Sequence, residues 1–296
     1  MKVVFFGTPE FAAQFLQGLL EETAFEVVCV VTQPDEPVGR KKILTPPPVK
    51  VLAATAGITV LQPTKLKDAT FLQTLENLQA EVGVVVAYGR ILPAPVLNLF
   101  PLGLLNVHPS LLPKYRGPSP MVAALAAGDN ETGISVIKLS KDMDAGPIMA
   151  QVHLPLAPDD TQTSLTQKVT AAGVPLLIQT LKDYAHGSLT MREQDHSQAT
   201  FCHLLTRADG ELRWSEPADT IERFVRAYNP WPGTASAGLK IFKVHITDVV
   251  LPPGEQRFEN GRFLIGTGTQ ALEVLELQAA GGKRMSAADY LRGKRQ

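Results

Sequence analysis

Short apolar runs alternate with helix-length or loop segments along the first half of the chain. The runs are rich in Val, Ile, Leu and Phe and lie at residues 3–6, 27–31, 82–87, 104–107 and 134–139. Strands that alternate with helical segments are typical of a parallel α/β sheet. After the first run, Phe11, Phe15 and Leu19 recur at every fourth position and predict one apolar face of a helix over residues 10–20. The sequence therefore predicts a Rossmann-like parallel or mixed sheet that opens with a strand, a tight turn and a helix.

The turn between that first strand and helix reads Gly7-Thr8-Pro9-Glu10. It lacks the second and third glycines that let a backbone approach a pyrophosphate and let the helix pack closely on the strand. We therefore exclude NAD or FAD binding at this turn.

A polar segment divides the chain. Residues 188–199 are rich in Gln, Ser, Thr and charged side chains and show no apolar periodicity, which suits an exposed linker. We expect a first domain over residues 1–187, a linker over residues 188–205 and a second domain over residues 206–296.

The second domain is expected to begin with one amphipathic helix. Its apolar residues follow helical spacing: Ile221, Phe224, Val225 and Tyr228. Ser215 is the expected N-cap, and the helix is expected to end at Asn229-Pro230. Short β-rich runs follow at residues 239–244, 245–250, 261–265 and 271–277, separated by Pro, Gly and Asn turns. These runs predict a small β-barrel.

Composition limits the classes of protein to which the chain can belong. The 296 residues are 45% hydrophobic, which is enough apolar material for two globular domains. The formal net charge is −1, so any contact with a nucleic acid must be local. Gly7 to Glu10 interrupt the first apolar run before a secretory or membrane segment develops. We expect a cytoplasmic protein.

The densest group of candidate catalytic residues ends the fourth apolar run. Asn106 and His108 are two positions apart on a predicted strand, so their side chains should face the same way. They would then lie at the carboxyl end of a parallel strand, where open α/β sheets bind ligands. An amide and an imidazole could there stabilise an oxyanion and transfer a proton. The alternative is a hydrogen-bonded histidine at a strand end beside an asparagine that forms a turn.

A second candidate segment, Asp142-Met143-Asp144-Ala145-Gly146, follows the fifth apolar run. A carboxylate here could orient an imidazole or stabilise its charge. The spacing does not choose between Asp142 and Asp144, and such a run also forms ordinary turns.

Metal and serine-hydrolase chemistry have weak support. Neither an HExxH motif nor a close pair of His with one carboxylate occurs, and the cysteines Cys29 and Cys202 lack zinc spacing. Ser110 does not lie in a Gly-x-Ser-x-Gly elbow. We expect no metal, two unreactive thiols and structural or exposed roles for the remaining histidines: His153, His186, His196, His203 and His245.

A short basic run lies on a loop rich in Pro and Gly. Arg40, Lys41 and Lys42 are adjacent cations that could contact phosphates. A solvated loop is the alternative interpretation.

Together, these segments resemble the methionyl-tRNA formyltransferases, within the folate-dependent formyltransferase family, along nearly the whole chain. The similar motifs occur in order: VFFGTPEFA at residues 4–12, QPD at 33–35, VAYGRILP at 86–93, NVHPSLLP at 106–113, DMDAGP at 142–147, VRAYNPWPG at 225–233 and KRMSAADYLRG at 283–293. The basic run reads Gly-Arg-Lys-Lys, where relatives have Gly-Arg-Gly-Lys-Lys.

The resemblance implies a reaction and its site. The formyl group of 10-formyltetrahydrofolate would pass to the α-amino group of initiator methionyl-tRNA, with Asn106, His108 and Asp144, rather than Asp142, as catalytic residues. The loop of Ser110, Leu111, Leu112 and Pro113 would contact the folate. The basic run of Arg40, Lys41 and Lys42 would contact tRNA.

The resemblance also implies an overall plan, with a catalytic first domain and an OB-like second domain that binds tRNA. We expect a monomer. Formyltransferases that act on glycinamide ribonucleotide or sugar nucleotides share the Asn, His and Asp residues. Those three residues therefore indicate only the reaction class. The alternatives are a formyltransferase for an amino-sugar nucleotide and an RNA-binding module that has lost activity.

Overall fold

The computed structural model describes residues 1–39 and 41–294, and its contacts divide the chain into two compact units. The first unit contains Met1–Pro120, Thr132–Leu154 and Thr166–Cys202. The second contains Met121–Glu131, Pro155–Leu165 and the chain from His203 on. The expected domain boundaries at residues 187 and 205 stay a prediction.

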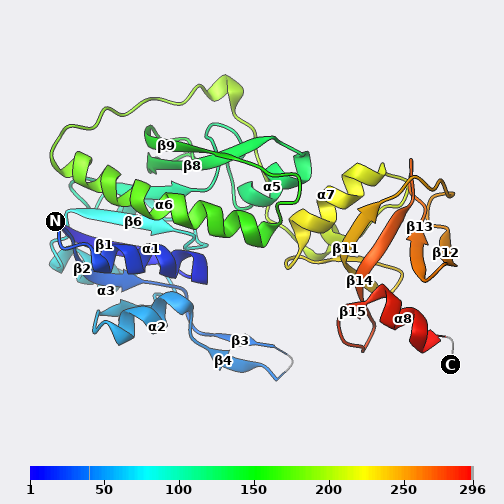
Figure 1. The fold of residues 1–296 in the computed structure, drawn as a ribbon. Coiled ribbons are helices and arrows are strands. Elements are labelled where there is room, and N and C mark those ends of the chain that lie inside the picture. Colours follow the sequence, from blue (N-terminus) through cyan, green and yellow to red (C-terminus); the bar gives the residue numbers. More distant parts are fainter. Residues whose placement is uncertain (40, 295–296) are drawn as a thin grey trace. The chain divides into compact units, whose positions relative to one another are not determined.

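A seven-stranded sheet forms the centre of the first unit, in the order β5-β2-β1-β6-β7-β8-β9 (Figure 1). The first five strands of this order run parallel, and β8 pairs antiparallel with β7. Their bounds are β1 Lys2–Gly7, β2 Glu26–Val31, β5 Val60–Leu61, β6 Val82–Val86, β7 Leu104–His108, β8 Glu131–Lys138 and β9 Ile148–Pro155. The predicted mixed α/β sheet is confirmed.

Helices α1 and α6 pack against each other. Helices α3 and α4 contribute side chains to a hydrophobic core cluster that also contains residues of β1. A methyl group at Gly173 of α6 would press on the Phe15 ring of α1, so the two helices approach closely. Val4 and Phe6 of β1 join the cluster that contains Phe71 of α3 and Val96 of α4. The helices of this unit are α1 Glu10–Glu21, α2 Pro48–Thr55, α3 Ala69–Asn77, α4 Ala94–Leu97, and the long α6 Gln162–Ala185, which begins in the second unit.

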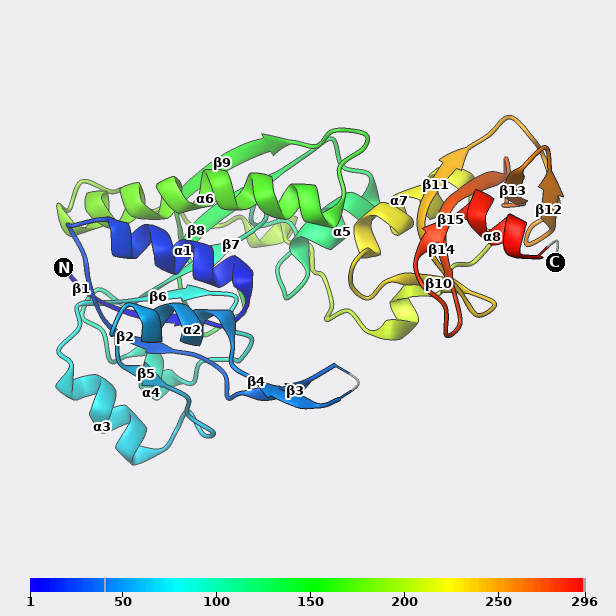
Figure 2. The same cartoon turned by 60° about the horizontal axis from the view of Figure 1, so that its bottom comes forward.

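A two-stranded hairpin carries Lys41 and Lys42 of the basic run (Figure 2). Its strands are β3 Glu36–Val38 and β4 Ile43–Thr45, which pair antiparallel. At its base, Asp35 accepts hydrogen bonds from Lys50 Nζ at 2.7 Å and Gln62 Nε2 at 2.8 Å. The hairpin is therefore held at its base while its strands are exposed to solvent.

An antiparallel six-stranded sheet forms the centre of the second unit, in the order β10-β11-β14-β13-β12 with β15 beside β14. Its elements are α5 Pro120–Ala127, which begins one residue before the unit, α7 Ala218–Tyr228, β10 Thr234–Ser236, β11 Leu239–Ile246, β12 Gln256–Glu259, β13 Arg262–Ile265, β14 Leu272–Ala279, β15 Met285–Ser286 and α8 Ala287–Lys294. The β-rich second domain of the predicted fold class is confirmed.

Two local predictions in this unit are wrong. Helix α7 is capped by Pro217 and not by Ser215, because the residue after Ser215 pairs with another loop: the Glu216 carbonyl accepts from Gly268 N at 2.9 Å. The expected strand over residues 245–250 does not form separately. Instead, His245 continues β11, which stays paired with β14 as far as Ile246.

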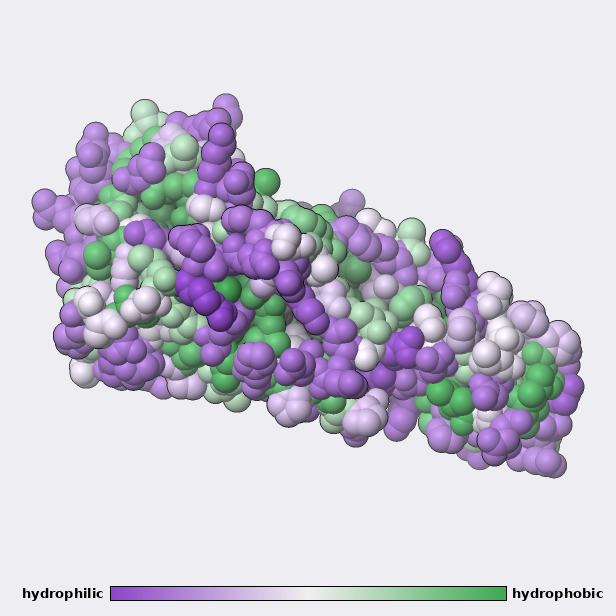
Figure 3. Space-filling view, turned by 90° about the horizontal axis from the view of Figure 1, so that it is seen from above, coloured by the Kyte–Doolittle hydropathy of each residue, from purple (hydrophilic) through white to green (hydrophobic). Residues whose placement is uncertain are grey.

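Polar side chains cover most of the face shown in Figure 3, with apolar residues in scattered patches. Within residues 1–39 and 41–294, no helix combines the length and the apolar character that a membrane span requires.

Candidate active site

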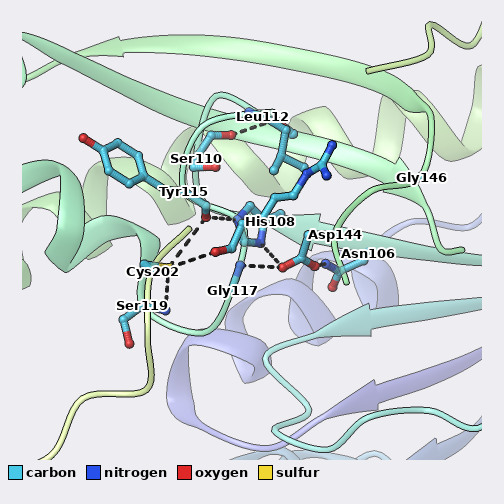
Figure 4. A network of polar contacts seen from close by, with 12 residues as sticks. Asn106, His108, Ser110, Leu112, Tyr115, Gly117, Ser119, Asp144, Gly146 and Cys202 are labelled. Atoms are coloured by element: carbon cyan, nitrogen blue, oxygen red, sulfur yellow. Dashed lines mark hydrogen bonds and ion pairs between the residues drawn. The ribbon is translucent and has the colours of Figure 1, made fainter. Parts of the chain in front are cut away.

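Strand β7 delivers Asn106 and His108 to one side of the sheet, as their two-residue spacing predicts (Figure 4). Both lie near the carboxyl end of a parallel strand, beside the end of β6. The His108 side chain is buried, whereas Asn106 is half-buried. The structure therefore brings this predicted pair together at the edge of the sheet where α/β proteins place ligands.

Asp144 reaches the same place from the turn between β8 and β9. Its Oδ2 accepts a hydrogen bond from Gly117 N at 2.8 Å and lies 3.6 Å from His108 Nδ1. Its Oδ1 is 3.5 Å from Asn106 Nδ2. Asp142, by contrast, is exposed. The geometry selects Asp144 as the carboxylate beside the imidazole, a choice that spacing alone leaves open.

The turn that presents Asp144 has an unusual backbone. Asp144 has a φ of 50°, in the left-handed region that L-residues rarely adopt. Two residues on, a side chain at Gly146 would collide with the carbonyl oxygen of Lys138. Glycine at that position lets the turn lie directly against the end of β8.

The His108 imidazole is held through Nε2, and its Nδ1 faces Asp144. Its Nε2 lies 2.9 Å from the Tyr115 carbonyl oxygen, which can only accept, so Nε2 carries a proton. In the neutral ring, Nδ1 is then an unprotonated nitrogen that faces Asp144. Burial lowers the pKa of His108 below its ordinary value of 6.5, and the nearby Asp144 charge and the bond to Tyr115 only partly offset this effect. The ring is therefore neutral at pH 7, with Nδ1 free to take up a proton.

Sequence reasoning missed three residues that build this site. Tyr115 supplies the carbonyl that fixes His108, and Gly117 supplies the N–H that holds Asp144. Gly117 has a φ of 116°, and a side chain there would collide with the Cys202 carbonyl oxygen. Gln194, from the expected linker, is buried and hydrogen-bonds to the carbonyls of Asp144 and Gly146. A glycine two residues after a tyrosine is too weak a pattern to predict these contacts.

The expected folate-binding loop is firmly fixed in the structure. Ser110 and Leu112 are buried: Ser110 Oγ donates to Lys114 O at 2.6 Å, and Leu112 packs on Ile137. Leu111 and Pro113 are half-buried. The contact of this loop with folate stays a prediction.

Lys41 and Lys42 are exposed between β3 and β4, and Arg40 lies outside the described residues. Their contact with tRNA stays a prediction. Among the described residues, no group of three or more His, Cys, Asp or Glu side chains could hold a metal ion. Burial raises the pKa of the Cys29 thiol to about 12 and also raises that of Cys202, so both thiols are protonated at pH 7.

Solved structures share this fold at low sequence identity. An N-formyltransferase from Helicobacter canadensis, in complex with folinic acid and dTDP-3-aminofucose, has a TM-score of 0.71 and 17% identity over 93% of this chain and 98% of its own. HypX from Aquifex aeolicus, in complex with tetrahydrofolic acid, has a TM-score of 0.68 and 17% identity over 98% of this chain and 47% of its own. This chain spans about half the length of HypX.

Sequence comparisons are more specific. Residues 1–181 match the family model described as formyl transferase, and residues 204–295 match that of the formyl transferase C-terminal domain. A methionyl-tRNA formyltransferase from Chloroflexus aurantiacus is 45% identical over 99% of this chain and 97% of its own. One from Herpetosiphon aurantiacus is 46% identical over 99% of this chain and 98% of its own. Both family models match, and the relatives align with nearly the whole chain, so this chain belongs to the methionyl-tRNA formyltransferase family.

Proposed function

We propose that this protein transfers the formyl group of 10-formyltetrahydrofolate to the α-amino group of initiator methionyl-tRNA, which gives the N-formylmethionyl-tRNA used to start translation. The observation that carries the proposal is the Asp144 carboxylate, placed beside His108 Nδ1 and the Asn106 amide at the end of β7. Relatives named methionyl-tRNA formyltransferase align with this chain from end to end. The structural neighbour with an amino-sugar nucleotide is only 17% identical, so its likeness concerns the fold and does not favour a sugar substrate.

The domain plan belongs to the same proposal. Residues 1–187 carry the catalytic domain, residues 188–205 join it to the second domain, and residues 206–296 bind tRNA. The enzyme acts in the cytoplasm as a monomer.

The residues around the catalytic group fit a formylated folate. The Asn106 amide can donate to a formyl oxygen, since one of its two N–H groups remains when the other points to Asp144. Ser110 and Leu112 are buried, so the loop meets the folate through Leu111, Pro113 and its backbone.

When bound, 10-formyltetrahydrofolate supplies an activated formyl group. Asn106 stabilises the negative charge that develops on the formyl oxygen, an effect of about 3 kcal/mol for one preorganised donor. His108 Nδ1 takes the proton that the methionine amine loses as it attacks the formyl carbon, and the imidazolium then gives this proton to the leaving folate nitrogen as the bond from that nitrogen to the formyl carbon breaks. The Asp144 carboxylate, 3.6 Å away, stabilises the imidazolium that results. Gly117 N–H and the Tyr115 carbonyl keep both partners in place throughout.

The β3–β4 hairpin contributes binding to tRNA. Lys41 and Lys42 are exposed at its turn and, with Arg40 beside them in the sequence, can meet phosphates. Apolar side chains on the two strands are also exposed: Val38, Ile43 and Leu44.

The proposed function is tested by supplying 10-formyltetrahydrofolate labelled in the formyl group together with either methionyl-tRNA or a dTDP-amino sugar. We expect label on methionyl-tRNA. Label on the amino sugar alone would assign a different substrate, and no transfer to either acceptor would favour a binding module without activity.

Two aspartates separated by one residue, Asp142 and Asp144, provide a matched test of the catalytic assignment. Asp144→Asn should lower kcat by about 100- to 10,000-fold, because it removes the charge beside His108 Nδ1. Asp142→Asn should leave kcat close to that of the unchanged enzyme. Circular dichroism checks that both variants fold. A folded Asp144→Asn protein that formylates at the normal rate would contradict the assignment.

The hairpin predicts a salt effect on tRNA binding. The double variant Lys41→Ala/Lys42→Ala should lower the slope of log affinity against log salt concentration by about 1 to 2, because each phosphate contact releases a counterion. A matched pair of exposed lysines outside the hairpin, Lys65→Ala/Lys67→Ala, should keep the original slope. Equal slopes in both double variants would refute the proposed contact.

The titration of His108 can be followed directly by NMR of its ring nitrogens. We expect a pKa below 6.5 and the tautomer with the proton on Nε2. As the pH falls, the unfolded chain takes up this proton first, so His108 should reduce the stability of the fold progressively below pH 6.5. Asp144→Asn should lower the pKa further because it removes a charge that raises it. A pKa above 6.5 would show that the Asp144 charge outweighs burial.

A further inference from the structure

The segment expected to be an exposed linker runs along the loops of the candidate active site. We call residues 192–202 the strap. At one end, Arg192 and Ile148 exchange backbone hydrogen bonds of 2.8 Å. At the other end, Thr200 O accepts from Arg116 N and Cys202 N donates to Arg116 O, both at 2.8 Å. Most of the strap is exposed, as its composition predicts, but these bonds fix it to the start of β9 and to the loop that follows β7.

Gln194 is the buried residue of the strap, with 5% of its surface exposed. Its Nε2 donates to Asp144 O at 2.8 Å and to Gly146 O at 2.7 Å. Its Oε1 accepts from Arg116 Nε at 3.1 Å and from the guanidinium NH2 at 2.7 Å. Carbonyls only accept and a guanidinium only donates, so the orientation of the amide is unambiguous. All of its hydrogen-bonding capacity is used.

These four bonds connect the turn that contains Asp144 to the loop that contains Arg116. On one side, Gln194 holds the backbone on either side of Ala145, in a turn where Asp144 has a left-handed conformation that its surroundings must maintain. On the other side, it holds Arg116, whose neighbour Gly117 donates to the Asp144 carboxylate. One side chain thus connects the anchor of the Asp144 backbone to the anchor of its carboxylate.

Arg116 strengthens the case for a positioning role. Its side chain is buried, with 5% exposed, and its guanidinium bonds to Gln194 Oε1 and, at 2.9 Å, to His196 Nδ1. Both partners come from the strap. The strap is therefore tied to this loop by a buried cation as well as by backbone bonds.

We propose that Gln194 is a positioning residue for Asp144: its carboxamide fixes the turn at residues 144–146 against Arg116 and so directs the Asp144 carboxylate toward His108 Nδ1. The expected effect of Gln194 on kcat rests on the proposed formyl transfer. The expected effect on the position of Asp144 beside His108 does not, because that arrangement can be measured without any substrate.

The nature of the bonds suggests an informative substitution. Glutamate at this position would keep an acceptor for Arg116 but could not donate to the carbonyls of Asp144 and Gly146, which it would repel. Gln194→Glu therefore releases the catalytic turn while it keeps the tie to Arg116. Gln194→Ala removes both. Gln198→Ala is the matched control, since Gln198 is exposed on the same strap.

The experiment measures kcat, KM for each substrate, thermal unfolding and the NMR titration of His108 in these variants. For Gln194→Glu and Gln194→Ala we expect kcat about 100-fold lower, the loss that follows when a catalytic group is displaced by about 1 Å. Both KM values should stay within about twofold, because the substrate contacts themselves are kept. The pKa of His108 should fall toward its value in Asp144→Asn. Gln198→Ala should match the unchanged protein in every measurement.

Two outcomes would overturn the proposal. One is a folded Gln194→Glu protein with normal kcat and normal His108 titration. The other is a loss of thermal stability in which the His108 titration is unchanged, which would indicate a purely structural role. If Gln194→Glu does not fold, Gln194→Met has similar length and no charge, and it removes the bonds to both loops as Gln194→Ala does without shortening the side chain. If the protein formylates neither acceptor, the His108 titration alone still decides the question.

Discussion

The structure of the site depends on the hydrogen bond from Gly117 N to the Asp144 carboxylate. This bond fixes one carboxylate oxygen 3.6 Å from His108 Nδ1, in a place where the neutral ring presents a lone pair. A carboxylate and an imidazole nitrogen that face each other in this way hold one added proton well. Burial keeps that proton off at neutral pH, so the position is free when an amine must lose a proton.

The surrounding loops maintain this arrangement from two sides. Gln194 and Arg116 hold the turn of Asp144, whereas Ser135 of β8 holds the loop after His108: Ser135 Oγ donates to Ser110 O at 2.7 Å and accepts from Leu112 N at 3.1 Å. In both networks side chains bond to backbone, and in the first the side chains of Gln194 and Arg116 also bond to each other. They fix the path of irregular segments that sheet pairing does not control, which is the preorganisation that catalysis requires.

Much of the fold follows from the sequence because it depends on local pattern. The single strand that carries Asn106 and His108 is confirmed, and alternation along a strand fixes which of its side chains share a face. Contacts between distant segments were not predictable in this way. Gln194 is 50 residues from Asp144, and nothing in a polar stretch distinguishes one buried glutamine from its exposed neighbours. The choice of Asp144 over Asp142 likewise needed a family resemblance, because it depends on how one turn packs against β8.

The central claim is that His108 and Asp144 act as one unit on a single proton. A double-mutant cycle in kcat/KM, with His108→Ala, Asp144→Ala and the combined variant, tests this claim most directly. If the claim is correct, the combined variant is about as slow as the slower single variant, because either substitution already disables the unit. A combined loss equal to the product of the two single losses would show that the residues act independently and would contradict the account.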